Sequence, residues 1–245
     1  MTSEIQAGKF EYQVGDESHI GYLALNTEQT GRRPAIFVIH EWWGINDYIQ
    51  RRVRQLAELG YVAFAVDMYG GGRTAANPEE AAALMNGVLG DMETGTDRLK
   101  AAFDTVAAMS EVDANRMAAI GYCFGGAMVL HMARIGMPLR AVASFHGALG
   151  SFHKPQPGEV KARILVCHGA SDAMVSADDV TAFEAEMQAA EANFKVIAYP
   201  GAAHGFTNPE TTEKGKKYGL PIGYDEQADQ SSWQSMNTMF SEVLN

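Results

Sequence analysis

Residues 118–128 read AAIGYCFGGAM, an apolar run that stops at a cysteine flanked by glycines. The apolar part is typical of a buried strand, and the segment after the cysteine is typical of a helix. The spacing of Gly121, Cys123 and Gly125 is that of a nucleophile elbow, a sharp strand-to-helix turn that exposes a nucleophilic side chain. The alternative is a tight turn that holds a small buried cysteine, and the flanking sequence bears on the choice.

Strand-like and helix-like segments alternate on both sides of this turn. Segments 10–14 and 19–25, separated by the turn-rich sequence GDES, predict an antiparallel hairpin. The alternation that follows predicts an α/β fold with a mostly parallel central sheet of about eight strands, an antiparallel N-terminal edge and helices on both faces. The other strands are expected over 34–40, 61–67, 117–122, 141–146, 163–169 and 194–200, and helices over about 46–60, 78–89, 96–109, 124–135, 180–187 and 226–243.

No repeat, low-complexity tract or linker divides the 245 residues, so one domain over 1–245 is expected. The net charge of −11 disfavours a nucleic-acid partner, because phosphate binding needs a basic surface. The N-terminal sequence MTSEIQAGKFEYQVG lacks the features of a signal peptide, and no apolar stretch is long enough to span a membrane. Two cysteines, Cys123 and Cys167, are too few for a disulfide framework and predict a reducing, cytoplasmic location.

A nucleophile at position 123 needs a base, and the base needs an orienting acid. In chains with a nucleophile elbow the order is nucleophile, acid, histidine. Asp172 follows the strand-like segment RILVCHG, and His204 follows the next one, FKVIAYP. Taken alone, Asp172 is equally a helix cap and His204 equally a loop histidine. Their order after Cys123 predicts a Cys123–His204–Asp172 triad, in which Cys167 has no part.

The stretch IHEWWGIN, 39–46, is the loop after a core strand. It begins like a zinc-protease helix, but Gly44 stands where the second histidine is required, so no metal site is expected. Glu41 either reaches the Cys123 sulfur or stays in solvent. The two tryptophans, of which Trp43 is the second, either wall a pocket or pack in the core.

Backbone N–H groups around the turn are the predicted oxyanion hole. The N–H of Phe124 opens a helix directly after the nucleophile, where unpaired amides favour developing negative charge. The loop after the 34–40 strand supplies the second donor in this arrangement, which predicts the N–H of Trp42. His40, His146 and His168 also lie near strand ends, but none has an acid placed as Asp172 is.

These residues resemble the dienelactone hydrolase family of α/β-hydrolases. The resemblance extends over nearly the whole chain, from PAIFVIHEWWGIN through GYCFGGAM to AAHGF. It implies the α/β-hydrolase fold and the Cys123–His204–Asp172 triad. It further implies that Glu41 is the acidic residue that holds the resting thiol until substrate binds. No cofactor is expected.

The sequence departs from that family's type members where those enzymes grip a substrate carboxylate with two arginines. One of these positions is Asn208, four residues after His204, and the other is Glu80 by ungapped counting. Neither residue replaces a bidentate arginine, although Arg73 is a candidate substitute. The substrate pocket is therefore expected to differ, and dienelactone itself is not the expected substrate.

The leading hypothesis is a carboxylic-ester hydrolase that cleaves a small ester or lactone through a cysteinyl acyl-enzyme. A broad carboxylesterase or thioesterase is the alternative among enzymes. A small-molecule-binding or thiol-sensing protein that retains the fold without turnover is the alternative outside them. The expected partner is a small-molecule substrate, with no nucleic acid or membrane, and the chain is expected to be a monomer or small homo-oligomer.

Overall fold

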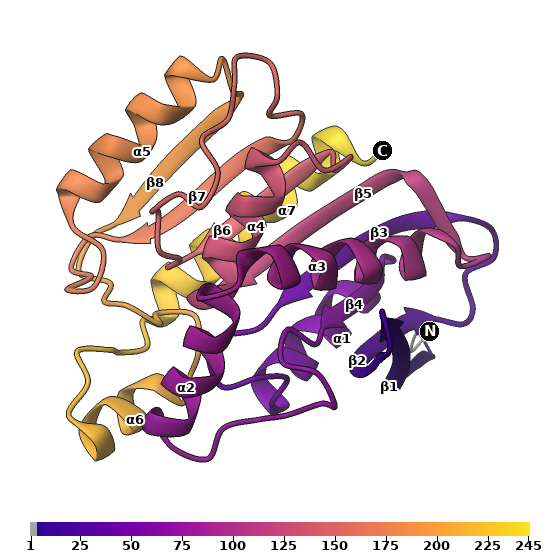
Figure 1. Cartoon of the computed structure of the whole chain (residues 1–245), viewed down its shortest axis with the longest axis horizontal. Coiled ribbons are helices and arrows are strands. Elements are labelled where there is room, and N and C mark those ends of the chain that lie inside the picture. The colour runs from indigo at the N-terminus through magenta and orange to yellow at the C-terminus, as the bar shows by residue number, and fades with distance from the viewer. Residues whose placement is uncertain (1–3) are drawn as a thin grey trace. The chain divides into compact units, whose positions relative to one another are not determined.

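A computed structural model describes residues 4–245, so the first three residues of the N-terminal stretch considered above lie outside it. From β3 onward strands and helices largely alternate, as predicted, except that α2 and α3, β6 and β7, and α6 and α7 follow one another directly (Figure 1). The strands are β1 Ile5–Val14, β2 Glu17–Asn26, β3 Arg33–Ile39, β4 Val62–Val66, β5 Val112–Tyr122, β6 Ala141–Phe145, β7 Arg163–Gly169 and β8 Phe194–Tyr199. The helices are α1 Asp47–Glu58, α2 Pro78–Leu89, α3 Met92–Ala107, α4 Phe124–Arg134, α5 Ala177–Ala189, α6 Thr211–Tyr218 and α7 Glu226–Val243.

The strands form one eight-stranded sheet in the order β1-β2-β4-β3-β5-β6-β7-β8. The N-terminal strands β1 and β2 pair antiparallel, and β2 pairs antiparallel with β4. The pairs β3–β4, β6–β7 and β7–β8 are parallel. The predicted mostly parallel sheet with an antiparallel N-terminal edge is therefore confirmed. The chain divides into two compact units, Met1–Ala119 and Ile120–Asn245, which are described in turn.

In the first unit, buried apolar strands are covered by amphipathic helices. Every residue of β4 is buried, which explains its continuous apolar sequence, because both faces of a strand between helices must be apolar. Helix α1 begins where the side chain of Asn46 accepts a hydrogen bond from the N–H of Ile49. Its buried positions, among them Val53 and Leu56, recur at the helical period and pack on β2 and β4.

In the second unit, β6 and β7 form the buried centre and β8 forms the edge. Helix α4 is buried along its whole length, and Figure 1 shows it in front of the strands with α7 behind them. Both helices pack on β6. This two-sided cover leaves the loops after β5, β7 and β8 as the places where side chains from different strands can meet.

Two differences from the sequence-based prediction have local causes. Helix α3 begins at Met92 rather than at 96, because the side chain of Asp91 accepts a hydrogen bond from the N–H of Thr94. Helix α6 was not predicted, because its sequence TTEKGKKY is short, polar and without an apolar period. Its Gly215 lies so close to the chain that a Cβ there would be 2.6 Å from the carbonyl oxygen of Ile222.

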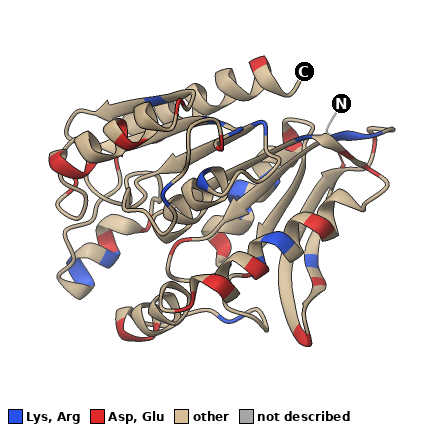
Figure 2. Ribbon diagram, turned by 45° about the horizontal axis from the view of Figure 1, so that its top comes forward, with Lys and Arg blue, Asp and Glu red and all other residues tan. Residues whose placement is uncertain are grey.

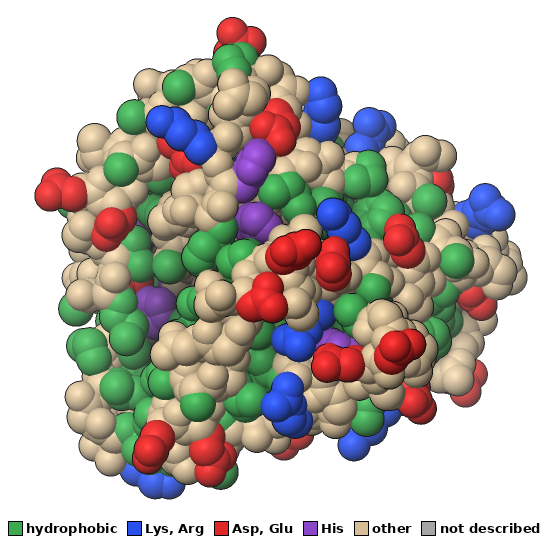
Figure 3. Space-filling model, in the orientation of Figure 1, with side chains coloured by type: hydrophobic (Ala, Val, Ile, Leu, Met, Phe, Trp, Pro, Cys, Tyr) green, Lys and Arg blue, Asp and Glu red, His purple; other side chains and the backbone are tan. Residues whose placement is uncertain are grey.

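Charged residues are spread over the surface. Figure 2 shows Lys and Arg interspersed with Asp and Glu along the helices, and Figure 3 shows hydrophobic side chains exposed between them. No helix within residues 4–245 has both the length and the apolar character that crossing a membrane requires.

Candidate active site

Cys123 lies in a sharp turn between the last residue of β5 and the first residue of α4. Its backbone has φ +53° and ψ −115°, a conformation that is rare and strained for a residue with a side chain. The N–H of Cys123 donates to the carbonyl oxygen of Phe145 at 3.0 Å, and its own carbonyl accepts from Gly126 at 2.9 Å. The side chain is half-buried. This is the geometry expected of a nucleophile elbow rather than of a cysteine enclosed in the core.

The glycines around the turn are required by close packing. A Cβ at Gly121 would overlap the backbone carbonyl of Gly125. A Cβ at Gly126 would lie 2.6 Å from the Ser144 hydroxyl and 2.7 Å from the Cα of Gly147. Because these neighbours are backbone or fully buried, they have little room to move.

Gly121→Ala is therefore expected to lower the free energy of unfolding by about 1–3 kcal/mol or more, the usual cost of overpacking. Urea unfolding followed by circular dichroism measures this change. Gly87→Ala is the matched control, because a Cβ there meets nothing within 4 Å and the residue lies inside helix α2. A Gly121→Ala protein as stable as wild type would contradict the close packing described here.

The loops after β7 and β8 bring the predicted acid and base together. Nδ1 of His204 and Oδ2 of Asp172 are 2.9 Å apart. The other oxygen of Asp172 accepts hydrogen bonds from the N–H groups of Met174 at 2.8 Å and Val175 at 3.2 Å. Burial raises the pKa of Asp172, but the hydrogen bonds and the charge of His204 outweigh it and leave the pKa below its usual value. The carboxylate is thus ionised and fixed in orientation.

Cys123 is the other neighbour that affects the His204 ring. Nε2 of His204 is buried and meets the hydrogen-bond criteria with no partner within residues 4–245. The Cys123 sulfur is nonetheless near enough to contribute to the raised pKa of the ring. Burial lowers the pKa of His204, but a charged Cys123 and the hydrogen bond to Asp172 raise it to about 10. The raised pKa of His204 favours the protonated imidazolium at neutral pH. The predicted triad residues lie together in the second unit.

The loop that carries His204 is braced by its own polar groups. The hydroxyl of Thr211 donates to the carbonyl oxygens of Gly205 at 2.9 Å and Asn208 at 2.6 Å. Asn208, predicted from the resemblance as a pocket residue, is 1% exposed, and its side-chain oxygen accepts from the N–H of Glu210 at 3.0 Å. The amide therefore has a structural task in this loop, and a role towards substrate stays a prediction.

In the first unit, Glu41 and Trp43 are buried and Trp42 is half-buried. The indole rings of the two tryptophans meet edge to face, with 5.1 Å between their centroids. The carbonyl oxygen of Trp42 accepts from the hydroxyl of Tyr69 at 2.9 Å. These contacts hold the loop after β3. The predicted roles of Glu41 and of the Trp42 N–H towards Cys123 stay predictions.

Asp67 organises the loop that carries Tyr69, and the sequence analysis did not single it out. One carboxylate oxygen accepts from the N–H groups of Tyr69 and Gly70, both at 3.0 Å. The other accepts from Ile20 at 3.0 Å and Gly72 at 2.7 Å. The signal available in the sequence is an acid directly after a buried strand and before three glycines, a pattern typical of a carboxylate that collects loop amides.

Arg73 and Glu80 serve local structure in the first unit. The guanidinium of the exposed Arg73 donates to the carbonyl oxygens of Gly70 and Tyr69. The carboxylate of Glu80 accepts from the N–H of Ala76 and from the side chain of Asn77, both at 2.9 Å, at the start of α2. Neither geometry tests a role towards substrate, which stays a prediction for both residues.

Two other sequence candidates are accounted for by burial. Nε2 of His40 accepts from the N–H of Met68 at 3.2 Å, and burial lowers the pKa of this fully buried ring. His40 is therefore a neutral structural residue. Cys167 is fully buried in β7, and burial raises its pKa to about 12, which leaves it without nucleophilic character at neutral pH.

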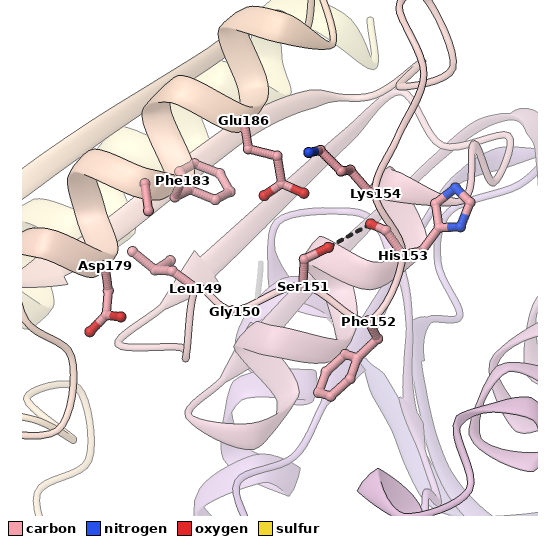
Figure 4. Close-up of a pocket in the computed structure, with 10 residues that line it drawn as sticks. Leu149, Gly150, Ser151, Phe152, His153, Lys154, Asp179, Phe183 and Glu186 are labelled. Carbon is pink, nitrogen blue, oxygen red and sulfur yellow. Dashed lines mark hydrogen bonds between the residues drawn. The ribbon is translucent and has the colours of Figure 1, made fainter.

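A separate hollow of about 470 Å³ lies between helix α5 and the segment 149–154. Figure 4 shows Glu186 and Lys154 facing each other across it and Phe152 turned away from it. None of the triad residues lines it. Among the described residues, 4–245, no three His, Cys, Asp or Glu side chains gather as a possible metal site.

Comparison with known proteins gives consistent matches. The model of the dienelactone hydrolase family matches residues 20–244. A crystal structure described as a dienelactone hydrolase-like promiscuous phosphotriesterase from metagenomic libraries is 33% identical, with a TM-score of 0.89 over 98% of this chain and 99% of that one. A structure titled m3DLH is 35% identical, with a TM-score of 0.91 and the same coverage. A Bradyrhizobium protein named "Probable 2-oxo-3-(5-oxofuran-2-ylidene)propanoate lactonase" is 30% identical over 78% of this chain and 79% of its own length.

Proposed function

Because the chain belongs to the dienelactone hydrolase family, we propose that it hydrolyses a small ester or lactone through a cysteinyl acyl-enzyme. The observation that carries the proposal is the 2.9 Å contact between His204 and Asp172 on a ring whose pKa also responds to Cys123. A strained thiol at a helix start, beside an oriented imidazole, is the arrangement that nucleophilic catalysis requires.

In the acylation step, the Cys123 thiol gives its proton to Nε2 of His204, and the resulting thiolate attacks the carbonyl carbon of the substrate. A carbon–sulfur bond forms and the carbonyl electron pair moves onto oxygen. The intermediate then collapses and breaks the bond to the leaving oxygen, which takes the proton from Nε2 of His204. The raised pKa of His204 supports this step, because it favours the protonated ring that the leaving oxygen needs.

In the deacylation step, water attacks the acyl carbon and gives a proton to Nε2 of His204. The carbon–sulfur bond breaks, the acid leaves, and the thiolate and imidazolium are restored. Asp172 holds the imidazole in one orientation through both steps.

The proposed oxyanion hole combines two backbone donors. Phe124 is the first residue of α4, so its N–H lies at the positive end of a helix dipole next to the nucleophile. The second donor is the one expected from the sequence, the N–H of Trp42, and Glu41 is the proposed partner of the resting thiol.

Phosphotriester cleavage is a second candidate activity, favoured by the 33% identical structure described as a promiscuous phosphotriesterase. The same thiolate would form a sulfur–phosphorus bond while a phosphorus–oxygen bond to the leaving alcohol breaks. The leaving oxygen takes its proton from His204, and water then releases the phosphodiester.

The proposal is tested by rapid quenching during reaction with p-nitrophenyl acetate, small lactones, acyl thioesters and paraoxon. A burst of p-nitrophenol and one acyl group on the peptide that contains Cys123 are expected. Comparison of kcat/KM across the four classes separates lactonase, thioesterase and phosphotriesterase activity. Alkylation of Cys123 by iodoacetamide without turnover of any class would instead indicate a binding or thiol-sensing protein.

A further inference from the structure

His146 occupies a strained and buried position beside the proposed catalytic histidine. It directly follows the last residue of β6, its φ is +41° and it is 1% exposed. Its ring meets the ring of His204 edge to face, with 5.3 Å between centroids and 65° between planes. A residue with a side chain keeps a positive φ only where its surroundings require it. The strained residue at the end of β6 is therefore the one whose ring packs on His204.

The same residue is bonded to the loop that carries His204. Nε2 of His146 and the hydroxyl oxygen of Thr207 are 2.8 Å apart, and Thr207 is fully buried. Phe145, the residue before His146, is hydrogen-bonded to the nucleophile turn: its carbonyl oxygen accepts from the N–H of Cys123 at 3.0 Å. The segment 145–146 thus joins the cysteine turn to the histidine loop.

One hydrogen bond does not determine the plane of an imidazole. Asp172 holds Nδ1 of His204, but the ring can still tilt about that contact. The ring of His146, held by Thr207, limits this tilt and keeps Nε2 in one place. We propose that His146 and Thr207 form a positioning pair that sets the plane of His204 relative to the Cys123 turn. This inference rests on the proposed cysteine-dependent hydrolysis.

Thr207→Val removes the hydroxyl at nearly constant volume and leaves the strained backbone of His146 untouched. With p-nitrophenyl acetate, kcat is expected to fall roughly 10- to 100-fold at unchanged KM, because small misplacement of a catalytic group has effects of this size. Thr207→Ser restores a hydroxyl and is expected to recover most of kcat. His146→Asn tolerates the positive φ but lacks the ring, so it is expected to reproduce the loss.

Ser232→Ala is the matched control, because it removes another fully buried hydroxyl, one that donates to the carbonyl oxygen of Asp229 in α7. Wild-type kcat in both Thr207→Val and His146→Asn would overturn the proposal. So would a raised KM with unchanged kcat in those variants.

The ring resonances of His204, observed by NMR in histidine-labelled protein without substrate, give a readout that needs no turnover. They are expected to shift in Thr207→Val and His146→Asn and to stay in place in Ser232→Ala. Unshifted resonances in all three would overturn the positioning role. If wild type turns over no ester, lactone, thioester or phosphotriester, the proposed function fails, and the spectra alone decide whether this pair sets the ring.

Discussion

Replacement of Cys123 by alanine is expected to reduce kcat/KM for p-nitrophenyl acetate by about 10⁶-fold, the order of the loss when a covalent nucleophile is deleted. The reason is that His204 and Asp172 can orient a proton but cannot form the acyl bond. The side chain of Cys123 is half-buried and loses only its sulfur in this variant, so the variant is expected to fold with nearly wild-type stability. Steady-state kinetics and thermal unfolding measure the two quantities.

Cys167→Ala is the matched control for this experiment. It removes the other thiol of the second unit, which is fully buried in β7 and carries a raised pKa. The variant is expected to keep kcat/KM and to lose some stability, because truncation in a packed core leaves a cavity. Near-wild-type turnover by Cys123→Ala, with Cys167→Ala equally active, would remove Cys123 as the nucleophile.

The parts of the fold that the sequence predicts well are those where one local pattern determines the structure. Strand β7 and helix α7 have the bounds that their apolar patterns indicate, 163–169 and 226–243. The Asp172–His204 contact was also predictable, because the chemistry of an elbow enzyme requires an acid and a histidine in that order after later strands.

The parts that could not be predicted depend on contacts between distant residues. His146 and Thr207 are 61 residues apart, and nothing in the local sequence around a histidine predicts a positive φ or a hydrogen-bond partner in a distant loop. Glu80 shows the opposite case. Its position three residues after the helix cap Asn77 is typical of a capping pattern, which local sequence can predict. The role in substrate binding was instead inferred from the family resemblance.

Asp172→Asn is expected to lower kcat by about 10³- to 10⁴-fold without unfolding the second unit. An asparagine oxygen can still accept from the N–H groups of Met174 and Val175, so the loop keeps its internal hydrogen bonds. The asparagine NH₂ group, however, donates where the carboxylate accepted. The imidazole then changes tautomer and carries its hydrogen on Nε2, where it can no longer accept a proton from water. Deacylation is expected to suffer most, so acyl-enzyme should accumulate on quenching.

Asp179→Asn is the matched control, because this exposed acid in the first turn of α5 accepts hydrogen bonds from the N–H and hydroxyl of its neighbour Ser176. It is expected to leave kcat unchanged. Equal kcat in Asp172→Asn and wild type would show that the acid does not orient His204 during turnover.

The same substitution has a pH signature in stability. The pKa of Asp172 is lowered in the folded chain, so its charge stabilises the fold above the pKa of the unfolded chain, about 4, and this contribution disappears as pH falls through the folded value. Wild type should therefore exceed Asp172→Asn in free energy of unfolding at pH 7, and the difference should shrink on acidification. Urea unfolding at several pH values measures it. A difference independent of pH would mean that His204 and the two amides do not hold the Asp172 carboxylate in its charged form. The raised pKa of His204 would then lose the contribution assigned to Asp172.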